Sequence, residues 1–147
     1  MKLVIFDFAG TIDSNKELEK DIIESIKNLS NKYNLAIISS TSSSYIKNYL
    51  ENKNIIKDFS DVLGAELFIS KTGRIRKLLE KYNISPQDVV YITDTLGDIL
   101  EAKNCGIKSI AVTWGLDDRK TLGKGDPKVI VDDPRKLISA IGNALVS

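Results

Sequence analysis

Five side chains able to do chemistry follow or precede apolar runs in this sequence. Asp7, Ser39 and Asp94 each come directly after an apolar run, Asp98 follows four residues later, and Lys71 opens an amphipathic helical pattern. Any one of them alone is more often a turn, a helix cap or a solvated residue. The carboxyl ends of parallel strands meet at one edge of a sheet, where open α/β sheets bind ligands. We therefore expect these side chains to gather in one site.

The paired carboxylates favour a hard divalent cation. Mg²⁺ prefers oxygen ligands and keeps several waters, so one or two carboxylates suffice to hold it. We predict Asp7 and Asp94 as direct ligands and the backbone carbonyl of Ala9 as a third. Asp98 would hold a metal-bound water or the turn itself. Such a cation would neutralise a phosphate and let a carboxylate attack its phosphorus.

A hydroxyl and a lysine complete the predicted phosphate site. Ser39 and Lys71 would bind the non-bridging phosphate oxygens, and Lys71 would also restrain the charge of Asp7. Ser40 is an alternative to Ser39, because both lie in a run of hydroxyl residues that also suits the start of a helix. Lys77 is likewise an alternative to Lys71.

Strand-like and helix-like patterns alternate along the whole chain. This alternation predicts a three-layer α/β/α, Rossmann-like fold with a central, mostly parallel sheet. Ser14 with Glu17 predicts a capping box for the first helix, and Asp133-Pro134 predicts the start of the last. We predict that the segment 114–127 is a loop and the most flexible region of the chain. Strands are expected at about 3–8, 35–39, 62–69, 89–93, 107–113 and 128–131, and helices along 18–29, 43–51, 72–82, 97–104 and 137–145.

Composition restricts the possible functions. The 147 residues suit a single domain, 1–147, and the net charge of +1 gives no reason to expect nucleic acid or membrane as a partner. The sequence contains no histidine, which excludes imidazole-based catalysis and imidazole metal ligands. Its one cysteine, Cys105, fits a small buried apolar residue in a reducing compartment, so we expect a cytoplasmic protein.

The segment Asp7-Phe-Ala9-Gly-Thr11 resembles the first motif of the haloacid dehalogenase (HAD) superfamily, Asp-x-Asp-x-Thr. Ser39, Lys71 and the Asp94–Asp98 pair follow in the order of the later motifs, and the segment 66–115 is similar to the phosphoglycolate phosphatase-like branch. The resemblance implies a Mg²⁺-dependent phosphohydrolase fold in which Asp7 is the nucleophile and forms an aspartyl-phosphate.

Ala9 departs from this motif. The family's second Asp is its general acid/base, which contributes about 10²–10⁴ in rate, whereas a methyl group transfers no proton. Ala at this position resembles phosphonoacetaldehyde hydrolase, whose cap-domain lysine stabilises a carbanion leaving group. Asp13 is an alternative acid, although a turn residue directed away from the site is expected there.

The chain is expected to lack a large cap. Only one helix lies between the first two predicted strands, so a partner copy in a homo-oligomer, or a macromolecular substrate, would have to cover the site.

Two functions therefore remain. The first is a phosphohydrolase acting on a phosphorylated small molecule or macromolecule, weakened or restricted by the loss of the acid. The second is a HAD-fold protein that binds Mg²⁺ and a phospho-ligand without useful turnover. C–Cl cleavage leaves Asp94 and Asp98 unexplained, and a phosphoryl-receiver domain would place its accepting Asp on an interior strand.

Overall fold

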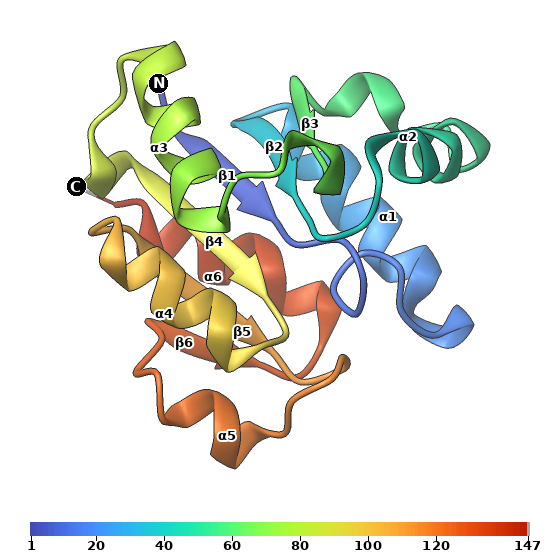
Figure 1. The fold of residues 1–147 in the computed structure, drawn as a ribbon. Coiled ribbons are helices and arrows are strands. Elements are labelled where there is room, and N and C mark those ends of the chain that lie inside the picture. Colours follow the sequence, from blue (N-terminus) through green and yellow to red (C-terminus); the bar gives the residue numbers. More distant parts are fainter. Residues whose placement is uncertain (147) are drawn as a thin grey trace.

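The computed structural model describes residues 1–146 as one six-stranded sheet with helices on both faces (Figure 1). All neighbouring strands are parallel, in the order β3-β2-β1-β4-β5-β6. The predicted α/β class and parallel sheet are confirmed. The strands are β1 (Leu3–Phe6), β2 (Asn34–Ile38), β3 (Asp61–Leu63), β4 (Val89–Thr93), β5 (Lys108–Val112) and β6 (Val129–Val131).

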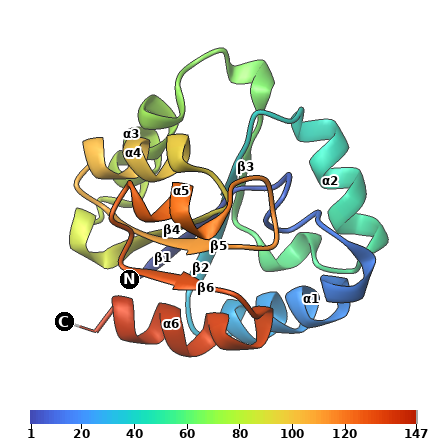
Figure 2. The same ribbon diagram turned by 90° about the horizontal axis from the view of Figure 1, so that it is seen from below.

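In residues 1–146, six α-helices form the two outer layers (Figure 2). Helices α1, α2 and α6 pack on one face of the sheet, and α3, α4 and α5 pack on the other. Their bounds are α1 (Lys16–Ser30), α2 (Ser43–Asn52), α3 (Lys71–Tyr82), α4 (Leu96–Asn104), α5 (Arg119–Gly123) and α6 (Leu137–Ala144).

The central strand β1 is buried on both faces, which explains its uninterrupted apolar sequence. Val4 and Phe6 pack into the core under α1 and α6, whereas Leu3 and Ile5 pack into the core under α3. A side chain at the end of this strand is therefore held by core on two sides.

The third predicted strand is wrong beyond residue 63. Strand β3 ends at Leu63, and a 3-10 turn (Ala65–Leu67) follows it before Phe68, whose φ of 52° is left-handed. An edge strand has one neighbour only, and residues 64–69 have none on which to extend the ladder. The apolar residues of this segment are exposed instead, Phe68 to 92%.

The predicted capping box of the first helix is also wrong. Asn15, not Ser14, is the cap, because its side chain accepts a hydrogen bond from the amide of Leu18 (3.0 Å). The hydroxyl of Ser14 donates to the carbonyl of Trp114 (2.9 Å) and ties the two loops together. Helix α5 occupies part of the segment 114–127 that was expected to be a loop.

The remaining predicted strands begin and end within two residues of the observed ones. Asp133 caps the turn that leads into α6, as predicted, through a hydrogen bond from the amide of Arg135 (2.9 Å).

Short connections join the strands that carry the site. Between β1 and β2 the chain forms α1, and between β2 and β3 it forms α2 and one 3-10 turn (Ile56–Asp58), so residues 1–146 include no large cap. Within the same residues, none of the helices has the length and apolar character needed to cross a membrane.

Candidate active site

The switch point of the sheet lies between β1 and β4. The chain leaves β1 for β2 on one side and returns to β4 on the other, so a crevice opens at the carboxyl ends of these strands. A cleft of about 870 Å³ lies there. Its lining residues include all of the predicted site residues: Asp7, Ala9, Ser39, Ser40, Lys71, Asp94 and Asp98.

Asp7 lies at the bottom of the cleft and is 5% exposed. Its Oδ1 accepts a hydrogen bond from the amide of Phe8 (2.9 Å) and lies 3.3 Å from Nζ of Lys71. Burial raises the pKa of Asp7 to about 8; Lys71 lowers it, and the nearby charges of Asp98 and Asp94 raise it further. Burial and the neighbouring carboxylates thus disfavour the ionised form of Asp7.

Asp94 is fixed by neutral donors from two loops. The hydroxyl of Thr11 donates to its Oδ1 (3.0 Å), and the amide of Leu116 donates to its Oδ2 (2.8 Å). A Cβ added at either Gly10, whose φ is 82°, or Gly115 would overlap with the Asp94 side chain. Two glycines therefore make room for this carboxylate beside the turn after β1.

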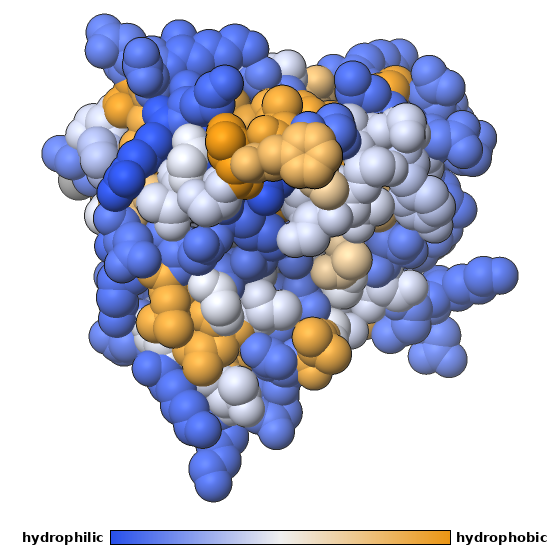
Figure 3. All heavy atoms as spheres, viewed as in Figure 1, coloured by the Kyte–Doolittle hydropathy of each residue, from blue (hydrophilic) through white to orange (hydrophobic). Residues whose placement is uncertain are grey.

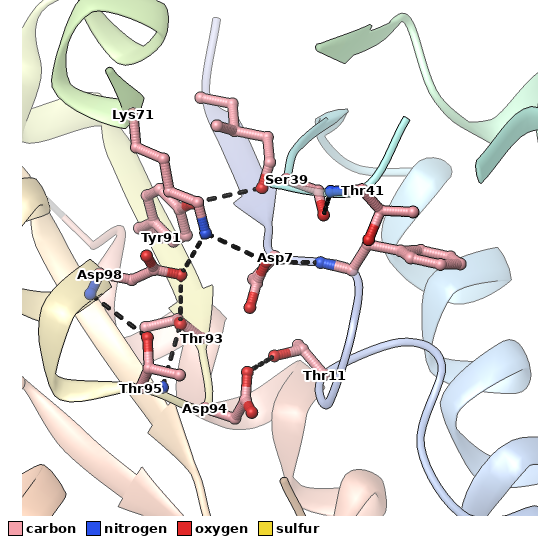
Figure 4. Close-up of polar contacts among 12 residues, drawn as sticks. Asp7, Thr11, Ser39, Thr41, Lys71, Tyr91, Thr93, Asp94, Thr95 and Asp98 are labelled. Atoms are coloured by element: carbon pink, nitrogen blue, oxygen red, sulfur yellow. Dashed lines mark hydrogen bonds and ion pairs between the residues drawn. The ribbon is translucent and has the colours of Figure 1, made fainter. Parts of the chain in front are cut away.

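Lys71 links two carboxylates. Its Nζ lies 2.8 Å from Oδ2 of Asp98 and 3.3 Å from Oδ1 of Asp7, and all three side chains are largely buried (Figure 4). Burial lowers the pKa of Lys71, but the charges of Asp7 and Asp98 outweigh it and raise that pKa. The structure places Lys71 in this cleft, whereas the alternative, Lys77, lines a separate cavity beside α3.

Asp98 faces Lys71 from the first turn of α4. The hydroxyl of Thr93 also donates to Asp98 Oδ2 (2.8 Å), and the same hydroxyl accepts from the amide of Thr95 (3.2 Å). These contacts engage Asp98 with the lysine. Whether Asp98 also holds a metal-bound water stays a prediction.

Ser39 directly follows β2 and is 1% exposed. Its hydroxyl accepts a hydrogen bond from the amide of Thr41 (3.1 Å), which closes a tight turn at the edge of the cleft. Ser40 lines the same cleft and is exposed. The structure thus brings both candidate hydroxyl residues to the cleft.

Ala9 is exposed at the mouth of the cleft. Asp13 is not among the residues that line it; its backbone carbonyl accepts from the amide of Gly10 (2.9 Å) and closes the turn. The indole of Trp114 donates to the carbonyl of Thr11 (3.0 Å), which is a packing role. Cys105 is half-buried and its Sγ lies 3.6 Å from the carbonyl of Thr72, away from the cleft.

Arg74 also lines the cleft, and the sequence did not single it out. It is 5% exposed, and its Nη1 donates to the carbonyl of Ser39 (2.6 Å). No sequence signal distinguishes it, because an arginine in the first turns of an amphipathic helix is usually solvated.

The cleft offers oxygen donors suited to a hard cation. In residues 1–146, no three acidic, His or Cys side chains converge on one point. The remaining donors are the carboxylates of Asp7 and Asp94, from adjacent strand ends, and backbone carbonyls. Asp7 shares Lys71 with Asp98, and Asp94 accepts hydrogen bonds from neutral donors alone, so these oxygens suit a divalent cation that keeps several water ligands.

The sequence is similar to those of proteins whose family is known. The sequence pattern of the haloacid dehalogenase-like hydrolases matches residues 13–112, a range that contains Ser39, Lys71, Asp94 and Asp98 and begins after Asp7. The chain is 30% identical over 110 residues to the phosphoglycolate phosphatase of Vibrio cholerae, covering 73% of this chain and 49% of that protein. The phosphoglycolate phosphatase of Synechococcus elongatus is 30% identical over 107 residues, covering 73% and 50%. The chain spans about half the length of these relatives.

The fold has solved counterparts. A haloacid dehalogenase-like family hydrolase from Streptococcus pneumoniae superposes with a TM-score of 0.78 at 18% identity, covering 95% of this chain and 97% of that one. The parallel sheet agrees with that solved structure, and the sequence match identifies the family. The chain belongs to the haloacid dehalogenase-like hydrolase family.

Proposed function

We propose that this chain is a Mg²⁺-dependent phosphohydrolase in which Asp7 attacks phosphorus. The observation that supports this most is the burial of Asp7 at the switch point of the sheet, against Lys71 and beside Asp94. The relatives named phosphoglycolate phosphatase make a small phosphorylated acid the first substrate to test.

Asp7, Asp94 and the carbonyl of Ala9 would hold Mg²⁺. Bound there, Mg²⁺ would offset the charge of the phosphoryl group and favour the ionised form of Asp7. Asp94 needs no rearrangement for this role, because Thr11 and Leu116 already fix both of its oxygens.

The other side chains would orient the phosphoryl group. A carboxylate oxygen of Asp7 attacks phosphorus, the bond to the leaving-group oxygen breaks, and the phosphoryl group is carried on Asp7. The hydroxyl of Ser39 and the ammonium of Lys71 donate to its non-bridging oxygens. Water then cleaves the aspartyl-phosphate and releases inorganic phosphate, which returns Asp7 to its starting state. Asp98 holds Lys71 in place throughout.

Ala9 limits both halves of this reaction. Its methyl group neither protonates the leaving group nor activates the water, and this help is worth about 10²–10⁴ in rate. Substrates whose leaving groups need little protonation are therefore expected to react best, and the aspartyl-phosphate is expected to persist. The second function considered, a binding protein without turnover, would follow only if this loss were complete.

Hydrolysis of p-nitrophenyl phosphate and acetyl phosphate, with and without Mg²⁺, tests the proposal. Wild type should release phosphate only with Mg²⁺, and Asp7→Asn should abolish release. Asp13→Asn is the matched control, because Asp13 does not line the cleft and its substitution should leave the rate unchanged. Loss of activity in Asp13→Asn would make Asp13 the missing acid. No hydrolysis by wild type, with Mg²⁺ and phosphate still bound, would establish the binding protein.

Apolar residues stand around the open cleft. Phe68 is 92% exposed three residues before Lys71, and Leu116, which lines the cleft, is 80% exposed. Figure 3 shows apolar surface on both sides of a hydrophilic depression. This exposure supports the expectation that a second copy of the chain, or the substrate itself, covers the site. Light scattering with and without phosphate would separate the two, because only a second copy doubles the mass.

A further inference from the structure

Arg74 is a buried cation at the edge of the cleft. It lies in the first turns of α3, is 5% exposed and lines the cleft with Lys71. Its Nη1 donates to the carbonyls of Ser39 (2.6 Å), Leu63 (3.1 Å) and Gly64 (3.1 Å). These carbonyls lie at the ends of β2 and β3, so the guanidinium contacts the backbone of the turn that carries the Ser39 hydroxyl.

The charge of Arg74 has no counterion in the described part of the chain. No carboxylate of residues 1–146 lies within 4.0 Å of its guanidinium, and its buried Nε has no hydrogen-bond partner. By contrast, Arg119 and Arg135 are exposed, and each pairs with an aspartate at 2.8 Å. Burying a charge without a counterion is costly, whereas a neutral donor could satisfy the same carbonyls at less cost.

Lys71 does not offer a comparable free charge. Its ammonium is shared between Asp7 and Asp98, so much of its field is offset before any ligand arrives. Of the two cations that line the cleft, Arg74 is thus the one without an ion-pair partner among residues 1–146. Because Nη1 is engaged by three carbonyls and Nε is buried, Nη2 is the guanidinium nitrogen left to donate to an anionic oxygen.

We propose that Arg74 is an anion-binding residue of this site, which takes an anionic oxygen of the substrate beside Ser39. The proposal rests on the proposed function and adds to it a requirement on the substrate. The anion is either the phosphoryl group itself or a carboxylate on the leaving group, since each presents an anionic oxygen that can accept from the guanidinium.

Calorimetric titration with two ligands in the presence of Mg²⁺ tests the proposal without any need for turnover. The ligands are inorganic phosphate and phosphoglycolate. Arg74→Gln is expected to weaken binding about 10–100-fold, the usual worth of a hydrogen bond to a charged group. Arg74→Lys should lose less, because it keeps the charge. Arg76→Gln is the matched control, an exposed arginine two residues along α3 that should bind like wild type.

The two ligands separate the two sources of the anion. Equal losses for both would assign Arg74 to the phosphoryl group, and a loss for phosphoglycolate alone would assign it to the carboxylate. Unchanged binding of both ligands by folded Arg74→Gln would overturn the proposal and leave the proposed function intact. Failure of wild type to bind either ligand would overturn both.

A measurement on the wild-type protein covers the case in which Arg74→Gln does not fold. The buried Nε–H of Arg74 should exchange slowly enough to give a resolved arginine signal in a ¹⁵N–¹H spectrum, identified by its loss in Arg74→Lys. Phosphate in the presence of Mg²⁺ should shift this signal, and phosphoglycolate should do the same. An unmoved signal under saturation with both ligands would contradict the proposal.

Discussion

The neighbouring ends of β4 and β1 differ in how completely they are prepared for chemistry. At the end of β4, both oxygens of Asp94 accept hydrogen bonds from neutral donors, and Gly10 and Gly115 shape the space around it. At the end of β1, Asp7 is buried with a raised pKa, and Ala9 offers no proton. Under the proposed function, the end of β4 already holds a metal ligand in position, whereas the end of β1 lacks the group that would transfer a proton.

The largest effect on turnover is expected when the general acid/base missing after β1 is restored. Ala9→Asp puts a carboxyl group where the family has its general acid/base, at an exposed position that lines the cleft. Turnover of p-nitrophenyl phosphate should rise about 10²–10⁴-fold, because the new carboxylate would activate the water that hydrolyses the aspartyl-phosphate, with little change in Mg²⁺ affinity. Steady-state kinetics with a parallel Mg²⁺ titration measures both. An unchanged rate would mean that parts of the site other than Ala9 also limit the reaction.

Displacing the Asp94 side chain at the end of β4 should have the next largest effect. Gly115→Ala forces a Cβ into the space of the Asp94 side chain and the carbonyl of Gly10. The free energy of unfolding should fall by about 1–3 kcal/mol, and Mg²⁺ binding should be lost. Gly123→Ala is the control, because a Cβ there meets no atom within 4 Å. Urea unfolding and Mg²⁺ calorimetry test this; retained Mg²⁺ affinity in Gly115→Ala would show that Asp94 is not the metal ligand.

A smaller effect is the pH dependence of folding stability that Asp7 causes. Its pKa is raised in the folded state, from 3.8 to about 8, so the folded state holds a proton that the unfolded state releases. The metal-free protein should therefore lose stability as pH rises from about 4 to 8. Asp7→Asn removes this loss and should be more stable at pH 8 by on the order of 1–2 kcal/mol, or roughly 3–6 °C in Tm.

Thermal unfolding between pH 5 and 8 in EDTA measures this dependence. Wild-type Tm should fall across the range relative to Asp7→Asn, and Mg²⁺ should raise the Tm of wild type alone. Parallel pH profiles of the two proteins would show that Asp7 keeps an ordinary pKa when buried.

The sequence predicted the sheet and the strand-end residues because both follow from local patterns. Apolar runs of four or five residues ending in a polar residue describe β1 and β4 well. The pattern failed where position in the fold decides the outcome. Leu67, Phe68 and Ile69 look like strand residues, but no neighbouring strand pairs with them.

Two parts of the site escaped prediction for the same reason. Gly115 lies in the segment 114–127 and was not singled out, because its proximity to Asp94 joins residues distant in sequence. Arg74 was not considered, because its burial depends on how α3 packs over the ends of β2 and β3. Residue types identify a candidate carboxylate, but only the packed structure shows which charges lack a partner.

The most direct test of the account is to look for the phosphoryl group on Asp7. The protein is incubated with acetyl phosphate and Mg²⁺, quenched in acid, and its intact mass and borohydride-reduced peptides are measured. We expect wild type to carry one phosphoryl group, located at residue 7, because Ala9 cannot activate the water that removes it. Asp7→Asn should carry none, and Ala9→Asp should carry less at steady state. Mg²⁺-dependent hydrolysis by a wild-type protein that is never phosphorylated at Asp7 would contradict the account.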